Sequence, residues 1–87
     1  TVTICDKIYG GIFLDKSKKR LTLLNMGGAY PKQKITVLIP DTCRFLFSKA
    51  PETNFKYKNV CITGMILLYN EKYEIVLAKP EDITIKK

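Results

Sequence analysis

The chain has 87 residues, of which 46% are hydrophobic and 26% are charged. A chain this short forms one domain with a modest core and has no room for a deep catalytic cavity, and its composition is too apolar for a disordered protein. Fifteen Lys and Arg residues against eight Asp and Glu residues give a net charge of +7. Such a surface attracts polyanions, so nucleic acid is the first partner to consider, followed by anionic membranes and acidic glycans.

The first third of the chain has the pattern of a β-hairpin. Residues 2–14 are mainly apolar and β-branched, and Gly10-Gly11 in the middle predicts a kink in this first strand. Residues 15–20 form a charged turn, and residues 21–26 resume the strand pattern. The sequence therefore predicts a hairpin with a basic tip.

A third strand is predicted over residues 34–39, where Pro40 ends it. Asp41-Thr42 can cap a short helix over residues 43–49, and Pro51 is expected to end that helix. Residues 52–58 are predicted to form a polar connection. The phenylalanines of this part of the chain and of the first strand are expected in the core or in the helix that plugs the barrel: Phe13, Phe45 and Phe47.

The strongest pattern in the chain is a second hairpin. Residues 60–69 and 73–77 are rich in β-branched, aliphatic and aromatic residues, with a short polar turn between them. Gly64 interrupts the first arm, where a missing side chain allows sharp coiling or the close approach of another backbone. The tail over residues 80–85 is expected to pack one or two apolar residues before it frays at Lys86-Lys87.

The order strand, strand, strand, helix, strand, strand is that of the OB-fold, a five-stranded Greek-key barrel. An SH3-like barrel usually lacks the helix between the third and fourth strands, and a β-sandwich needs more strands. We therefore expect an all-β fold with one short helix between strands 3 and 4, formed as a single OB-fold domain over residues 1–87.

The chain also resembles a family of small bacterial OB-fold domains assigned to nucleic-acid binding, some of them in exported proteins or lipoproteins. Nearly the whole chain carries the resemblance, through Tyr9-Gly10, residues 24–28, Tyr30-Pro31, residues 35–39, residues 58–66, Tyr69, residues 75–77 and residues 80–83. Asn59 and Glu71 depart from it, since relatives often have glycine there. The resemblance implies nucleic-acid binding, and it favours an exported, periplasmic or lipoprotein-anchored location over a cytoplasmic one.

The three cysteines, Cys5, Cys43 and Cys61, form no CxxC pair, which argues against zinc-ribbon and redox motifs. We expect them to be small buried hydrophobic residues, with one disulfide and a free thiol as the alternative in an exported protein.

No apolar run is long enough to span a bilayer, and no signal peptide is visible. The chain begins at Thr1 rather than Met, as it would after removal of a leader or a preceding region, so the sequence leaves the compartment open.

No catalytic constellation is visible. The chain has no His, which is the commonest acid–base group and metal ligand, and a Cys nucleophile would lack its usual imidazole base. Asp6, Asp15 and Asp41 could meet around a divalent ion only if three different elements brought them together. We therefore expect no enzyme, no cofactor and no metal site.

The candidate binding residues combine cationic and aromatic side chains. The basic tip of the first hairpin lies in a loop that borders the binding face of OB-folds, and it can follow a phosphate backbone. Exposed tyrosines can stack on bases, although tyrosines at strand ends also close barrel mouths. The predicted nucleic-acid-binding residues are Lys16, Lys18, Lys19, Arg20, Tyr30, Lys32, Lys34, Tyr69, Lys72 and Tyr73.

The sequence thus predicts a non-catalytic module that binds single-stranded DNA or RNA with low sequence specificity. The rival hypotheses are a protein-interaction module of an exported or cell-envelope protein, including self-association, and a module that binds oligosaccharides or anionic lipids. OB barrels serve all of these uses.

Overall fold

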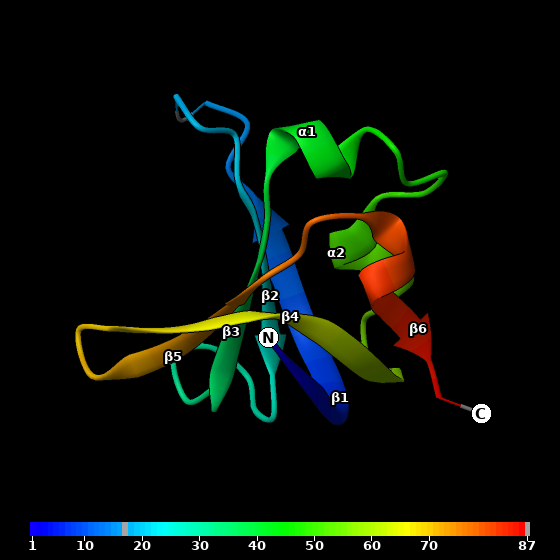
Figure 1. Ribbon diagram of the computed structural model, residues 1–87. Helices are drawn as coiled ribbons and strands as arrows, with labels where there is room; N and C mark the ends of the chain where they lie inside the picture. Colours follow the sequence, from blue (N-terminus) through cyan, green and yellow to red (C-terminus); the bar gives the residue numbers. More distant parts are fainter. Residues whose placement is uncertain (17, 87) are drawn as a thin grey trace.

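Five strands close into a barrel in which the first and fourth strands complete the circle (Figure 1). The computed structural model describes residues 1–16 and 18–86. The barrel strands are β1 (Val2–Phe13), β2 (Thr22–Met26), β3 (Ile35–Ile39), β4 (Asn59–Tyr69) and β5 (Lys72–Val76). Neighbours follow the order β1-β2-β3-β5-β4-β1, and only the β3–β5 pair is parallel. The predicted all-β OB-fold barrel is confirmed.

Alternation along the strands separates the core from the outer surface. In β2, Thr22, Leu24 and Met26 are buried, whereas Leu23 and Asn25 point outward. Successive strand residues face opposite sides, so each strand contributes alternate side chains to the interior. The buried apolar core consists of Ile8, Leu24, Met26, Val37, Ile39, Cys43, Phe55, Val60, Ile62, Ile75, Leu77 and Ile83.

The long first strand serves two neighbours because it bends in the middle. Residues 2–7 pair with β4 and residues 8–13 pair with β2, with a register shift between Ile8 and Gly10. Gly10 has a φ of +147°, which side chains rarely adopt. The kink predicted at the glycine pair is confirmed.

Gly64 marks the point where β4 changes partner. It lies opposite Val2 of β1, and the next residue, Met65, lies opposite Val76 of β5. A Cβ atom at position 64 would collide with the carbonyl oxygen of Val76. The close backbone approach predicted at this glycine is therefore present.

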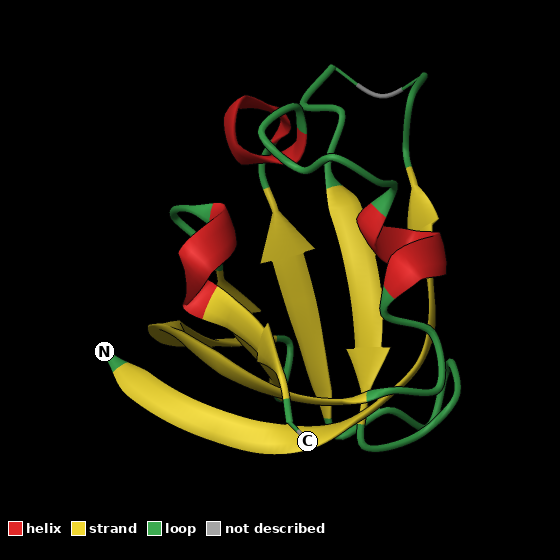
Figure 2. Ribbon diagram, turned by 90° about the vertical axis from the view of Figure 1, so that its right-hand side faces the viewer, coloured by secondary structure: helices red, strands yellow, loops and turns green. Residues whose placement is uncertain are grey.

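Two short helices, rather than the one predicted over residues 43–49, lie between β3 and β4: α1 (Asp41–Arg44) and α2 (Pro51–Asn54). They flank the strands (Figure 2). No side chain caps α1, which follows Pro40. Pro51 begins α2 instead of ending α1, because the N–H that proline lacks has no partner at the first helical position.

The segment between the helices corrects a second prediction. Phe47 packs against the core and meets Phe55 edge-on, with ring centroids 6.1 Å apart. Phe45, however, is 74% exposed and Leu46 is exposed beside it. Three consecutive apolar residues cannot all face one barrel, so the segment buries Phe47 and leaves the other two outside.

The tail adds a short strand. A 3-10 turn, η1 (Pro80–Asp82), leads into β6 (Ile83–Ile85), which pairs with residues 60–62 of β4. Ile83 is buried, so the predicted packing of the tail is confirmed. The predicted fraying does not begin at Lys86, whose N–H donates a hydrogen bond to the carbonyl oxygen of Asn59 at 2.8 Å, and Lys87 lies outside the described residues.

Two of the cysteines are not the free buried thiols we expected. Cys5 of β1 and Cys61 of β4 are directly opposite in the register and form a disulfide. Cys43 is buried and free, and its burial, with a smaller effect of Asp82 and Glu81, raises the pKa of its thiol. The alternative of one disulfide and one free thiol is what the structure contains.

Among the described residues, no helix is both long and apolar enough to cross a membrane.

Candidate functional site

An apolar row crosses the outer face of the barrel. The strand registers place Ile12 beside Leu23, Leu23 beside Leu38, Leu38 beside Val76, and Val76 beside Met65, so that all five strands contribute. The end members are the most accessible, Ile12 at 55% and Met65 at 60%. A row of this kind on the outside of a small barrel indicates a contact surface rather than core.

A second outer row, two residues further along each strand, is polar. Asn25 of β2 lies beside Thr36 of β3, and Thr36 lies beside Glu74 of β5. The row ends at Gly10 on one side and at the exposed Leu67 on the other. The two rows together give the outer face an apolar half and a hydrogen-bonding half.

A groove of about 590 Å³ runs over these two rows. Its walls come from β1, β2, β3, β5 and the loop between β2 and β3, through Gly11, Ile12, Leu23, Asn25, Tyr30, Gln33, Thr36 and Glu74. Gln33 donates a hydrogen bond from Nε2 to Oγ1 of Thr36 at 3.0 Å, while its Oε1 is buried without a partner. Tyr30 is 75% exposed, so its ring is free to stack on a ligand in the groove.

The tip of the β4–β5 hairpin meets the β2–β3 loop at one end of this face. Lys72 Nζ donates a hydrogen bond to the carbonyl oxygen of Pro31 at 3.4 Å. Tyr69 pairs with Lys72 across the hairpin, and Tyr73 lies beside Ile35 at the start of β3. The structure therefore brings part of the predicted set to this end, namely Tyr30, Lys32, Tyr69, Lys72 and Tyr73, all exposed.

Lys34 is close to this group in the sequence, but its side chain lies over Gly27. A Cβ added at Gly27 would lie 3.0 Å from the Lys34 Cβ. The lysine is exposed. It belongs to the rim of the β2–β3 loop rather than to the groove.

The basic tip of the first hairpin occupies the opposite end of the β1–β2 pair, since it follows Phe13 and precedes Thr22 (Figure 1). Lys16, Lys18 and Lys19 are exposed there. Arg20 is different, because its Nε lies 3.6 Å from Oδ1 of Asp41 and its guanidinium lies 5.4 Å from the Phe13 ring centre. The predicted site is therefore split into two cationic ends with the groove between them.

A second group of lysines and tyrosines, outside the predicted set of binding residues, does not line the groove. Lys7 Nζ lies 5.4 Å from the ring centre of Tyr9 and 5.9 Å from that of Tyr57, and Lys56 Nζ lies 5.1 Å from Tyr57. The alternation of lysine and aromatic residues over 56–58 was its visible signal. Nearby, Lys49, Lys56 and Lys58 line a hollow of about 400 Å³ beside α2. The lysines thus do not form one continuous stripe.

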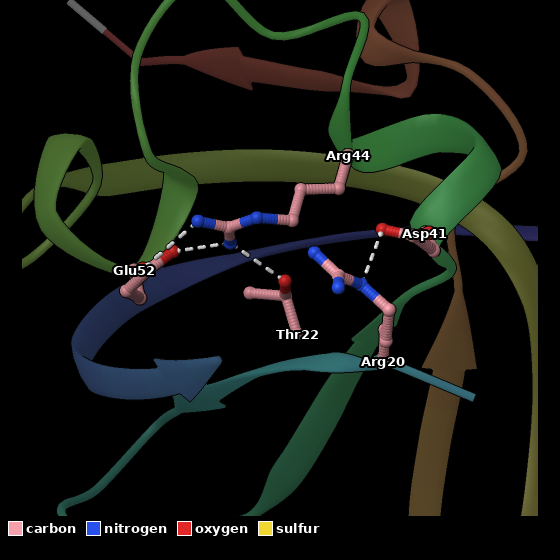
Figure 3. A network of polar contacts seen from close by, with 5 residues as sticks. All are labelled: Arg20, Thr22, Asp41, Arg44 and Glu52. Carbon is pink, nitrogen blue, oxygen red and sulfur yellow. Dashed lines mark hydrogen bonds and ion pairs between the residues drawn. The ribbon is translucent and has the colours of Figure 1, made fainter. Parts of the chain in front are cut away.

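Arg44 is engaged in structural contacts, and its side chain is only 17% exposed. It donates hydrogen bonds to Thr22 at 2.7 Å and to both carboxylate oxygens of Glu52 at 2.6 and 3.2 Å (Figure 3). Its guanidinium also lies 3.6 Å from the Phe13 ring centre. The hydrogen bonds from Arg44 hold the pKa of Glu52 below its ordinary value.

The acidic residues considered for a metal ion are not gathered in one place. Asp6 lies in β1, Asp15 in the loop that follows it, and Asp41 at the start of α1, where it pairs with Arg20. Within residues 1–16 and 18–86, no group of three or more Cys, Asp or Glu side chains could hold a metal ion.

Comparisons of the chain with protein-family models, with curated proteins and with solved structures find no match.

Proposed function

We propose that this chain is a non-catalytic OB-fold module that binds single-stranded DNA or RNA along its outer groove, with low overall sequence specificity. The observation that supports this most is the position of the groove, which has an exposed tyrosine in its wall and lies between two cationic ends. Single-strand binders combine these same two features, a charged track for the backbone and aromatic platforms for the bases.

The groove and its two cationic ends would bind different parts of the nucleic acid. Lys16, Lys18 and Lys19 at one end, and Lys32 and Lys72 at the other, would neutralise phosphates and release their counterions. The apolar row and the Glu74 carboxylate inside the groove are unsuited to phosphate. Bases would therefore occupy the groove, with Tyr30 in its wall as the stacking surface.

Fluorescence anisotropy of a labelled single-stranded oligonucleotide of roughly 12 nucleotides, a length that one OB fold can cover, tests the proposal. Binding at about 50 mM salt should weaken steeply by about 200 mM. Tyr30→Ala should weaken binding, because one stacked base is worth about 1–3 kcal/mol. Tyr57→Ala removes another exposed ring, from the second lysine–tyrosine group, and should leave the affinity unchanged. Absence of binding at low salt contradicts the proposal.

A second candidate function, protein interaction in an exported or envelope protein, is favoured by two observations. The Cys5–Cys61 disulfide is typical of oxidising compartments, and the apolar row from Ile12 to Met65 is an accessible contact surface. Sedimentation measurements on the wild type and on a Met65→Lys variant test self-association. A wild type that is dimeric and a Met65→Lys variant that is monomeric would support this candidate. If both proteins are monomeric, nucleic-acid binding is the better account.

A further inference from the structure

The floor of the outer groove is rich in hydrogen-bond acceptors. Glu74 contributes a carboxylate, which only accepts, and the ion pairs among the described residues, Arg20–Asp41 and Arg44–Glu52, do not include it. Thr36 and Asn25 can both accept and donate, and the Thr36 hydroxyl already accepts a hydrogen bond from Nε2 of Gln33. A ligand group that faces Glu74 must therefore bring N–H or O–H donors.

Bases differ sharply in what they offer to a carboxylate. The Watson–Crick edge of guanine carries N1–H and N2–H side by side, which a carboxylate can accept as two parallel hydrogen bonds. Cytosine and adenine each offer one exocyclic amino group there. Thymine and uracil offer only N3–H, flanked by two carbonyl oxygens that a carboxylate repels.

We propose that Glu74 makes the outer groove select one base of the bound strand by its amino edge, with guanine preferred and thymine or uracil rejected. This rests on the proposed nucleic-acid function and adds base selection to it. Glu74 lies beside Thr36, and Thr36 lies beside Asn25, so a base edge placed over Glu74 has the Thr36 hydroxyl as its neighbour. Unstacked bases of single strands are commonly recognised on this edge while their faces lie on an aromatic ring, a role that Tyr30 can fill.

The test uses an oligothymidine of roughly 12 nucleotides in which one central base is replaced by guanine, adenine or cytosine. With the wild type, the guanine-containing strand should bind about tenfold more tightly than plain oligothymidine, the size expected of one bidentate contact. The readout is the ratio of the two affinities, because a change of protein charge alters both to the same extent.

Two variants remove the same charge from different places. Glu74→Gln should abolish the guanine preference, while Glu71→Gln, at the exposed tip of the β4–β5 hairpin, should keep it. Glu74→Ser serves the same purpose as Glu74→Gln without offering an amide to adenine. Since Glu74 lies on the outer face, circular dichroism should show all three variants folded.

The outcomes separate this inference from the proposed function. Oligonucleotides that bind with equal affinity whatever their central base, or a guanine preference that survives in Glu74→Gln, overturn the role of Glu74 and leave nucleic-acid binding standing. Failure of every oligonucleotide to bind overturns both. Binding of an oligosaccharide in place of any oligonucleotide would show that the acceptor floor serves hydroxyl donors, and it also overturns both.

Discussion

Arg44 and Glu52 join the two helices by a forked ion pair, with Nη1 to Oε1 at 2.6 Å and Nη2 to Oε2 at 3.2 Å. The same guanidinium covers the Phe13 ring of β1 and reaches the buried Thr22 of β2. One side chain thus ties α1, α2 and two barrel strands together at this end of the barrel (Figure 3). Because the helices have only four residues each, this contact rather than helix propensity holds them in place.

The first prediction concerns acid stability. The Arg44 hydrogen bonds lower the pKa of Glu52 from its ordinary value of 4.5, so the folded state favours the carboxylate. The stabilisation is complete above that ordinary pKa and is lost as the pH falls through the lower pKa of the folded state. Glu52→Gln should cost about 1.5–3 kcal/mol near neutral pH.

Thermal unfolding followed at several pH values measures this effect. The wild type should lose stability below about pH 4.5 more steeply than Glu52→Gln, since the variant has already lost the titrating carboxylate. Parallel pH dependences for the two proteins would show that the Arg44–Glu52 pair does not contribute to acid stability.

The second prediction concerns Gly64. An alanine there would place its Cβ against the carbonyl oxygen of Val76, so the β4–β5 pairing must shift, at a cost of about 1–3 kcal/mol. Met65→Ala changes the next residue, which is 60% exposed, and should alter stability by less than about 0.5 kcal/mol. Chemical denaturation of the two variants checks the difference, and equal stabilities would contradict the tight approach of β5 at this glycine.

The third prediction concerns the thiols. Native protein should resist alkylation, because Cys5 and Cys61 are joined and Cys43 is buried with a raised thiol pKa. Unfolding should expose one thiol, and unfolding with reduction should expose three. Mass spectrometry after alkylation counts them. Three reactive thiols without reductant would contradict the disulfide, whose removal in Cys5→Ser should cost about 2–5 kcal/mol.

The fourth prediction concerns the basic loop between β1 and β2. Each phosphate contact on a single strand contributes about 0.7 to the slope of log affinity against log salt. Lys18→Ala combined with Lys19→Ala should therefore make that slope shallower by about 1.4. Lys56→Ala combined with Lys58→Ala removes the same charge beside α2 and should leave the slope unchanged. If the second pair has the larger effect, the strand binds on that side of the barrel.

The barrel could be predicted from the sequence because alternation and two glycines determine it. Residues of β2 and β3 alternate between buried and outward positions, and Gly10 and Gly64 occur where a strand must bend or admit another backbone. These are local signals. The helices were predicted less well, because a proline can begin a helix as readily as it ends one, and the sequence around Pro51 does not distinguish the two cases.

The candidate site was predicted only in part, for a different reason. Exposed lysines and tyrosines are visible in the sequence, but their grouping depends on which strands lie side by side. Glu74 and Thr36 are 38 residues apart in the sequence, yet they lie side by side in one row of the sheet. Tyr57 meets Lys7 only because distant segments pack together. Local sequence patterns do not predict which distant residues become neighbours in the fold.

The most direct test of the central claim is backbone amide mapping by NMR during titration with a single-stranded oligonucleotide. Binding along the outer groove predicts the largest shifts at Asn25, Thr36 and Glu74, with smaller ones at Lys18 and Lys72. Shifts concentrated instead at Lys7, Tyr9, Lys56 and Tyr57, with the polar row unmoved, would contradict it.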